Sequence, residues 1–248
     1  MRIILSPAKK MRIAADTMLP LTVPVFLQNA EEITRWMQTL SYEQAKKLWT
    51  CNDKIAGENF ERFAHMELQN QAMLTPAVLA YDGIAYQYMA PAVFEDGSFD
   101  YVQEHLRILS GFYGVLRAMD GVVPYRLEMQ AKAKVRGTKN LYEYWGNQLY
   151  QEVTDGSRVI VNLASKEYSV CIEKYLQPSD RYITCTFGEL AGDRIVQKGV
   201  YAKMARGDMV RFMAENRIED PADIRRYDRL GYRFCEERSS EEEYIFLK

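Results

Sequence analysis

The apolar positions of this chain fall into short runs that alternate with longer segments of helical spacing. The first run, Ile3 to Leu5, ends at Ser6-Pro7 and is typical of a buried strand that leads into a loop. A later run, Arg158 to Leu163, is rich in β-branched residues, and helical spacing follows it over Lys166 to Leu176. These two segments predict one strand–helix unit.

The same patterns predict the other elements. Helices are expected over Asn29 to Leu40, from a Ser41 cap through Trp49, and over Asn59 to Met66, Gly83 to Met89, Ser98 to His105, Leu141 to Val153 and Val200 to Ile218. Strands are expected over Ala77 to Tyr81 and Leu106 to Leu109, in a hairpin of Tyr182 to Phe187 with Arg194 to Val196, and in a pair of Tyr232 to Phe234 with Tyr244 to Phe246. Because strands and helices interleave without a linker, we predict one compact domain over residues 1–248, with a mixed sheet and surrounding helices. The class is α/β, with α+β as the alternative.

Composition agrees with a globular protein that works inside the cell. The chain has 248 residues, 48% of them apolar and 27% charged, which is enough to build a packed core. Its N-terminal apolar run is too short for a signal sequence or a membrane span, so we expect a cytoplasmic protein that does not enter the membrane. The scattered cysteines suit a reducing compartment and argue against a zinc site: Cys51, Cys171, Cys185 and Cys235.

The overall charge does not attract a polyanion, because 32 basic residues face 34 acidic ones. A case for nucleic acid must therefore rest on local clustering. On the longest predicted helix, Lys203, Arg206 and Arg217 lie together beside an apolar stripe, where a basic strip can follow a phosphate backbone. An ordinary solvated helix face is the alternative. Other basic positions join this surface if the fold brings them near, among them Lys9, Lys10, Lys132, Lys134, Arg136 and Lys139.

The segment from Leu106 to Glu128 combines arginines, tyrosines and glycines. The guanidinium group of an arginine can form two parallel hydrogen bonds with a phosphate, and the segment has three arginines, Arg107, Arg117 and Arg126. Nearby glycines let the backbone approach a ligand. The alternative is that these arginines pair internally with Asp120 and Glu128. Since arginine is costly to bury without a partner, we favour a binding site, and we expect the three arginines to converge with Lys203 and Arg206.

Residues 41–66 form a predicted helix–turn–helix. Its stretch Asp53-Lys54-Ile55-Ala56-Gly57 resembles the hairpin of helix-hairpin-helix DNA-binding motifs, in which backbone amides face a phosphate without reading sequence. Lys54 and Gly57 are the candidate contacts. The usual proline-glycine pair is absent, and an ordinary pair of antiparallel helices is the alternative.

Signatures of well-known enzyme classes are missing. Neither a dinucleotide-binding G-x-G-x-x-G nor a Walker A loop occurs, and Ser6-Pro7-Ala8-Lys9 matches S-x-x-K without its companion motifs. The two histidines, His65 and His105, stand alone and suggest no metal site. Asp120 and Glu128 are the weak candidates for an acid or base. We therefore expect no cofactor, and binding rather than catalysis.

Seven ordered blocks carry a resemblance that covers nearly the whole chain. They are SPAKK at Ser6 to Lys10, DKIAGENFERF at Asp53 to Phe63, HLRILSGFYGVLR at His105 to Arg117, PYRLEM at Pro124 to Met129, LYEYWG at Leu141 to Gly146, VNLASKEY at Val161 to Tyr168 and YAKMARGDMVRFMAENR at Tyr201 to Arg217. Together they resemble the peroxide-stress protein YaaA family. Segment 12–29 and the acidic stretch 236–243 follow no family pattern.

The resemblance implies a cytoplasmic bacterial protein that limits iron-linked oxidative damage and binds DNA through a basic cleft and a helix-hairpin-helix-like element. It places the cleft candidates at Lys9, Arg107, Arg117, Arg126, Lys203, Arg206 and Arg211. We expect binding to duplex or distorted DNA without sequence specificity.

Two other functions stay open. One is an enzyme that acts on nucleic acid or nucleotides in the same cleft, as in base excision. The other, weaker one is iron sequestration, for which the chain offers no ready ligand cluster. A buried carboxylate or lysine deep in the cleft favours the enzyme, whereas a shallow cleft lined by exposed basic groups favours binding.

Overall fold

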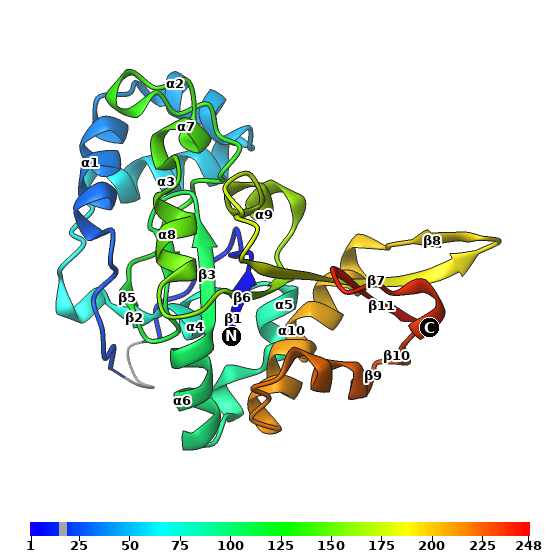
Figure 1. Ribbon diagram of the computed structural model, residues 1–248. Coiled ribbons are helices and arrows are strands. Elements are labelled where there is room, and N and C mark those ends of the chain that lie inside the picture. Colours follow the sequence, from blue (N-terminus) through cyan, green and yellow to red (C-terminus); the bar gives the residue numbers. More distant parts are fainter. Residues whose placement is uncertain (15–18) are drawn as a thin grey trace.

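Three buried parallel strands form the centre of the molecule. The computed structural model describes residues 1–14 and 19–248, and Figure 1 shows its arrangement. Strand β1 (Arg2–Leu5) lies between β3 (Leu106–Ser110) and β6 (Val159–Leu163) and pairs parallel with both. Ile3 and Ile4 are fully buried, as expected for a strand covered on both faces.

The sheet continues on both sides of this centre in the order β4-β3-β1-β6-β7-β11-β10-β9. Beyond β6, parallel pairing extends through β7 (Arg181–Ala191) to β11 (Glu243–Leu247). The antiparallel strands are β4 (Gly114–Leu116), β8 (Arg194–Val196), β9 (Asp228–Arg229) and β10 (Tyr232–Phe234), and a separate pair joins β2 (Thr75–Pro76) to β5 (Gly121–Val122). The predicted mixed α/β architecture is confirmed.

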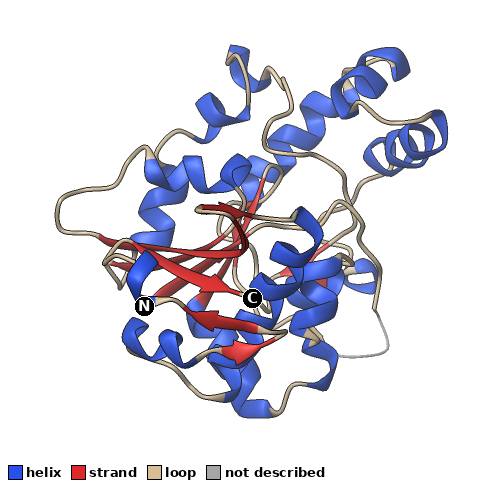
Figure 2. Ribbon diagram, turned by 90° about the vertical axis from the view of Figure 1, so that its right-hand side faces the viewer, coloured by secondary structure: helices blue, strands red, loops and turns tan. Residues whose placement is uncertain are grey.

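Helices surround the central strands of the sheet, as Figures 1 and 2 show, whereas the β7–β8 hairpin projects away from them in Figure 1. They are α1 (Leu27–Gln38), α2 (Tyr42–Trp49), α3 (Asp53–Ala64), α4 (Ala77–Ala80), α5 (Ile84–Met89), α6 (Asp96–His105), α7 (Leu141–Trp145), α8 (Gln148–Thr154), α9 (Lys166–Glu173) and α10 (Gly199–Glu215). Short 3-10 turns lie at Gln71–Met73, Pro91–Val93, Val135–Gly137, Pro221–Arg226 and Glu236–Arg238. Among the described helices, none is long and apolar enough to cross a membrane.

Most predicted elements are confirmed, and four differ. In the predicted hairpin, Arg194 to Val196 pairs with Glu189 to Ala191 at the end of β7, whereas Tyr182 to Phe187 pairs with β6 and β11. Residues 77–80 form a helical turn instead of a strand; all four side chains are buried, so their apolar run carries no period to distinguish the two. The helix predicted from Leu141 to Val153 breaks at Gly146, whose φ of 53° leaves the helical region. Helix α3 begins at Asp53, six residues before the predicted start, because the Asn52 side chain accepts the Ile55 amide and caps the helix there.

Helix α10 packs unusually closely against α5. A Cβ atom at Gly207 would lie 1.8 Å from the carbonyl oxygen of Ala85, so only glycine permits this approach. Figure 1 shows α10 passing beside α5 below the centre of the sheet. The contact fixes the position of α10 relative to α5, and therefore the positions of the basic residues on the preceding turn of α10.

Candidate functional site

A cavity of about 390 Å³ opens at the carboxyl ends of β1 and β6. This is where open α/β sheets usually bind ligands. It is lined by segments 5–10, 82–86 and 125–128, by Leu163, Ser165, Glu167 and Tyr168 where β6 leads into α9, and by Lys203 and Arg206 of α10. We call it the strand-end cavity.

A pair of serines joins the two loops that follow β1 and β6. Ser6 Oγ accepts the backbone amide of Ser165 at 2.8 Å and donates to Ser165 Oγ at 3.1 Å. The Tyr86 hydroxyl also donates to the Ser6 carbonyl at 3.0 Å. Ser6 therefore connects the loops after β1 and β6 and contacts α5 through Tyr86.

Glu128 is the centre of an ion cluster at one wall. Its Oε1 lies 3.0 Å from Arg126 Nη2 and 3.2 Å from Lys9 Nζ, and the residue is only 9% exposed. The segment that carries it runs against Gly111, where a Cβ atom would lie 2.7 Å from the Leu127 carbonyl oxygen. Gly111 therefore allows the close approach of another segment of the protein's own backbone, whereas the sequence predicted that the glycines here let the backbone approach a ligand.

Helix α10 contributes the opposite cations. Lys203 is exposed, whereas Arg206 is half-buried, and this burial lowers the pKa of its guanidinium. Within the described residues, Arg206 Nε is buried without a hydrogen-bond partner. A buried guanidinium edge without an acceptor is a feature that an anionic ligand would satisfy.

A second carboxyl group lies at the start of α9. Glu167 Oε1 accepts the Gln130 amide at 3.3 Å, and burial raises the pKa of Glu167, with the nearby Glu128 adding to the effect. Tyr168 beside it is buried, and this burial raises the pKa of its hydroxyl. Two of the carboxyl groups that line the cavity therefore lie in different settings: Glu128 is paired with cations, whereas burial raises the pKa of Glu167.

Replacing Glu167 by glutamine is expected to stabilise the folded protein at neutral pH. Because the pKa is raised in the folded state, the wild-type chain has its full stability below the ordinary glutamate pKa and loses part of it as the pH rises through the raised value. The melting temperature of Glu167→Gln relative to wild type should therefore increase between about pH 4 and about pH 7. Thermal unfolding at the two pH values tests this, and a difference that shrinks with rising pH would contradict it.

A wider groove adjoins the cavity and shares Lys9 and Glu128 with it. The groove has a volume of about 830 Å³ and lies between the α1–α2 region and residues 130–134. Its basic side chains are Lys9, Lys47, Lys132 and Lys134, and Trp36 and Trp49 form part of its wall. The Trp49 indole donates to the Arg126 carbonyl at 2.6 Å, which ties α2 to the wall of the cavity. We call this space the lysine groove.

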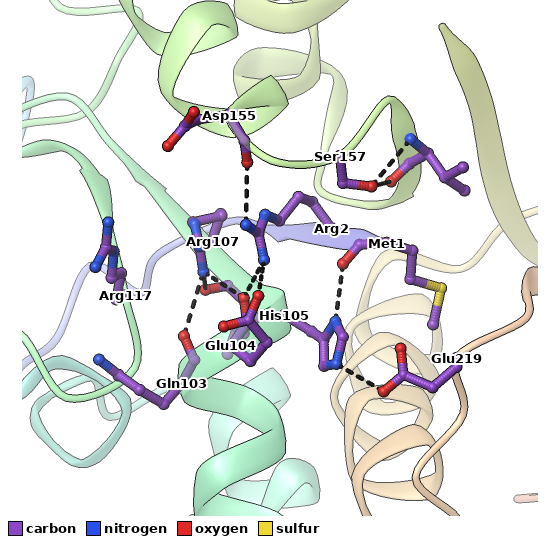
Figure 3. Close-up of polar contacts among 12 residues, drawn as sticks. Met1, Arg2, Gln103, Glu104, His105, Arg107, Arg117, Asp155, Ser157 and Glu219 are labelled. Atoms are coloured by element: carbon purple, nitrogen blue, oxygen red, sulfur yellow. Dashed lines mark hydrogen bonds and ion pairs between the residues drawn. The ribbon is translucent and has the colours of Figure 1, made fainter.

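Arg107 and Arg117 do not join the strand-end cavity. Figure 3 shows Arg107 beside Arg2, with its guanidinium donating to backbone carbonyls of Gln103 and Glu104 and with Arg117 nearby. Burial, with the charges of Arg2 and Arg117, lowers the pKa of Arg107 to about 10, and Arg117 lies 3.7 Å from Glu152. The expected convergence of five cations is therefore wrong for these two. They lie near the start of β3, whereas the cavity opens where the parallel strands end.

The remaining predicted contacts also lie outside the strand-end cavity. Arg211 is paired with Glu215 at 2.7 Å on α10, and Lys54 and Gly57 lie on α3. Residues 41–66 do form two helices, with a Ser41 capping box as expected, but the connecting turn is Thr50 to Asn52. The stretch Asp53 to Gly57 is the first part of α3, so its amides do not form the hairpin that the pattern suggested.

Asp120 belongs to a turn and does not face the cavity. It is 1% exposed, and its carboxylate accepts Thr22 Oγ1 at 2.6 Å and the Arg117 amide at 2.8 Å. Burial raises the pKa of Asp120. Of the two candidate acid–base residues, the structure places only Glu128 in the cavity. No three described His, Cys, Asp or Glu residues are grouped so as to hold a metal ion.

The comparison with known families bears on this arrangement. Residues 1–238 match the family model described as "Peroxide stress protein YaaA". The chain belongs to the peroxide stress protein YaaA family. It is similar to UPF0246 proteins along essentially its whole length: 61% identical over 246 residues to one from Agathobacter rectalis, covering 99% of this chain and 98% of that protein, and 54% identical over 248 residues to one from Desulfitobacterium hafniense, covering 100% and 98%. A protein from Pediococcus pentosaceus is 47% identical over 248 residues, covering 100% and 98%.

Membership of the YaaA family confirms the resemblance drawn from the seven blocks, and the blocks supply much of the cavity. SPAKK, PYRLEM, VNLASKEY and the start of YAKMARG each contribute lining residues. Sequence reasoning missed Ser165, Tyr168 and the segment 82–86. Ser165 and Tyr168 lie within a recognised block at the end of a predicted strand, and this position is the signal that points to them. Segment 82–86 carries no such signal.

Proposed function

We propose that this member of the YaaA family is a DNA-binding protein of the peroxide-stress response. The strand-end cavity and the lysine groove would together hold duplex or distorted DNA without sequence specificity, and so limit iron-linked oxidative damage. The observation that supports this most strongly is the continuity of the two spaces through Lys9 and Glu128.

Their local charge is positive although the chain is not. The cations of the cavity are Lys9, Lys10, Arg126, Lys203 and Arg206, the groove adds Lys47, Lys132 and Lys134, and the carboxyl groups of both are Asp82, Glu128 and Glu167. Eight basic side chains thus face three acidic ones, on a chain with net charge −2. Such local excess attracts a phosphate backbone and gives affinity that does not depend on base sequence.

Two carboxyl groups of the strand-end cavity favour a second candidate, an enzyme that acts on a nucleotide there. Glu128 is paired with Arg126 and Lys9, whereas burial raises the pKa of Glu167, and a carboxyl group with a raised pKa can serve as a general acid. If this is correct, purified protein alters a damaged or mismatched duplex, and Glu128→Gln slows the reaction about 100-fold or more. An unaltered duplex after prolonged incubation supports binding alone.

Affinity for duplex DNA is expected to fall steeply with salt. Phosphate contacts release counterions, so the logarithm of the binding constant should decrease linearly with the logarithm of salt between about 50 and about 200 mM. Scrambling the base sequence should change the affinity little. Fluorescence anisotropy with a labelled duplex measures both effects. A salt-independent isotherm would remove the basis of the proposed function.

The double variant Lys203→Ala with Arg206→Ala refines this measurement. It should reduce the salt slope by about two, because each contact releases about one counterion. The control is Lys174→Ala with Arg194→Ala, which removes two exposed cations that line neither space. Equal slopes for the two double variants would show that the α10 cations do not contact phosphate.

A further inference from the structure

The chemistry of the strand-end cavity is too specific for phosphate attraction alone. We infer that it holds one nucleoside monophosphate unit, either a free nucleotide or one unpaired nucleotide of a DNA strand. The second source rests on the proposed function, whereas the first does not.

Size limits the occupant. A volume of about 390 Å³ lies near the lower end of the range for ligand pockets, about 300 to 1,000 Å³. A double helix cannot enter such a space, and the wider lysine groove next to it is the place for a backbone. The cavity therefore accepts a single small unit.

The walls suit a planar ring. Tyr86, Tyr125 and Tyr168 line the cavity together with aliphatic residues such as Leu5 and Leu163. The Tyr125 hydroxyl is held at 2.7 Å by Tyr81 and at 2.6 Å by Ser110, so this ring is fixed before any ligand arrives. Rigid aromatic and aliphatic walls favour a flat heteroaromatic group.

The polar groups require a ligand that is both an anion and a hydrogen-bond donor. Arg206, whose Nε has no acceptor among the described residues, lines the cavity with Lys203 and Lys9 and supplies charge for a phosphate. A simple anion would be repelled by Glu128 and Glu167, and an apolar ligand would leave Arg206 Nε without an acceptor. Amino and imino groups of a nucleobase donate to carboxylates, so a nucleotide satisfies both sets.

The first arm of the test uses free nucleotides. The full chain is titrated by calorimetry with dAMP, dGMP, dCMP and TMP, and separately with inorganic phosphate. We expect saturable binding of at least one nucleotide at one site per chain, at least about 10-fold tighter than inorganic phosphate, because the ring adds contacts that phosphate lacks.

The second arm uses DNA that contains 2-aminopurine, whose fluorescence rises when it leaves the base stack. The probe is placed as a single unpaired bulge in one duplex and paired in another, since an unpaired base costs less to extract. We expect protein to change the fluorescence of the bulged duplex and to leave that of the paired duplex nearly unchanged.

A filling variant locates the site. Ile84→Trp places an indole in the cavity, and Val93→Trp adds the same group at a residue that is 66% exposed and lies outside it. Ile84→Trp should lower the affinity for the nucleotide, or the size of the fluorescence change, by about 10-fold or more. Val93→Trp should leave both quantities unchanged. If Ile84→Trp does not fold, the wild-type titrations still decide.

The outcomes separate this inference from the proposed function. Binding in the first arm alone supports a free nucleotide, and a signal in the second arm alone supports a nucleotide of DNA. If no nucleotide binds in the first arm and the fluorescence does not change in the second, the inference is wrong, even where salt-dependent duplex binding is intact. Tight binding of free nucleotides without any duplex binding supports the inference and overturns the proposed function.

Discussion

Replacing Gly207 by alanine is expected to destabilise the folded protein by on the order of 3 kcal/mol. The added Cβ would lie 1.8 Å from the Ala85 carbonyl oxygen and 2.6 Å from its carbon, and backbone atoms cannot rotate away as a flexible side chain can. At about 2 to 4 °C per kcal/mol for a chain of this size, the melting temperature should fall by roughly 6 to 12 °C. Calorimetric thermal unfolding measures the change.

Gly57→Ala is the matched control. Gly57 lies inside α3, and a Cβ atom there would meet nothing within 4 Å, so the substitution should stabilise the protein by about 0.5 to 1 kcal/mol through helix propensity. A melting temperature for Gly207→Ala equal to that of Gly57→Ala would show that α10 and α5 can separate without cost. Residual Gly207→Ala protein should also bind DNA more weakly, because the shift moves Lys203 and Arg206.

Reversing the three outer charges of the lysine groove is expected to lower the affinity for duplex DNA by on the order of 100-fold at about 100 mM salt. Lys47, Lys132 and Lys134 are exposed, and none has an ion-pair partner among the described residues, so all three are available to phosphate. Their replacement by glutamate should also flatten the salt slope by about three. Fluorescence anisotropy over a salt series gives both quantities.

The same number of reversals elsewhere controls for net charge. Lys174, Arg181 and Arg194 are exposed and line neither the cavity nor the groove. Changing them to glutamate alters the total charge equally, so their effect should be several-fold smaller than that of the groove variant. Similar losses for both sets would mean that DNA responds to the whole molecule and not to this groove.

The sequence predicts the helices and strands better than it predicts which of their residues come together in the fold. The apolar runs at Ile3 to Leu5 and Val159 to Leu163 are strands because β-branched, mostly buried segments suit a parallel sheet. The predicted pair of Tyr232 to Phe234 with Tyr244 to Phe246 is confirmed by the register of Phe234 opposite Phe246. In contrast, Ala77 to Tyr81 lacks any period, and its helical turn is decided by tertiary packing.

The candidate site shows the same limit. Arg126, Lys203, Arg206 and Lys9 are predicted together and do line one cavity, because their segments lie at the ends of β1 and near α5 and α9. Arg107 has the same chemistry but lies close to the start of its strand, so its side chain meets Arg2. Whether a strand residue lies at the site depends on its position along the strand. The residue type does not reveal that position.

The pairing of β1 has a consequence for how the chain is made. Its partners β3 and β6 lie about a hundred and more than a hundred and fifty residues further along, and the serine link joins Ser6 to Ser165. Lys203 and Arg206 come later still. During synthesis on the ribosome, β1 therefore cannot pair with β3 and β6 until most of the chain has been made. A polypeptide released before α10 emerges lacks the basic residues that α10 contributes to the cavity. Long-range closure of this kind is slow, so newly made chains expose unpaired strand edges until these partners have formed.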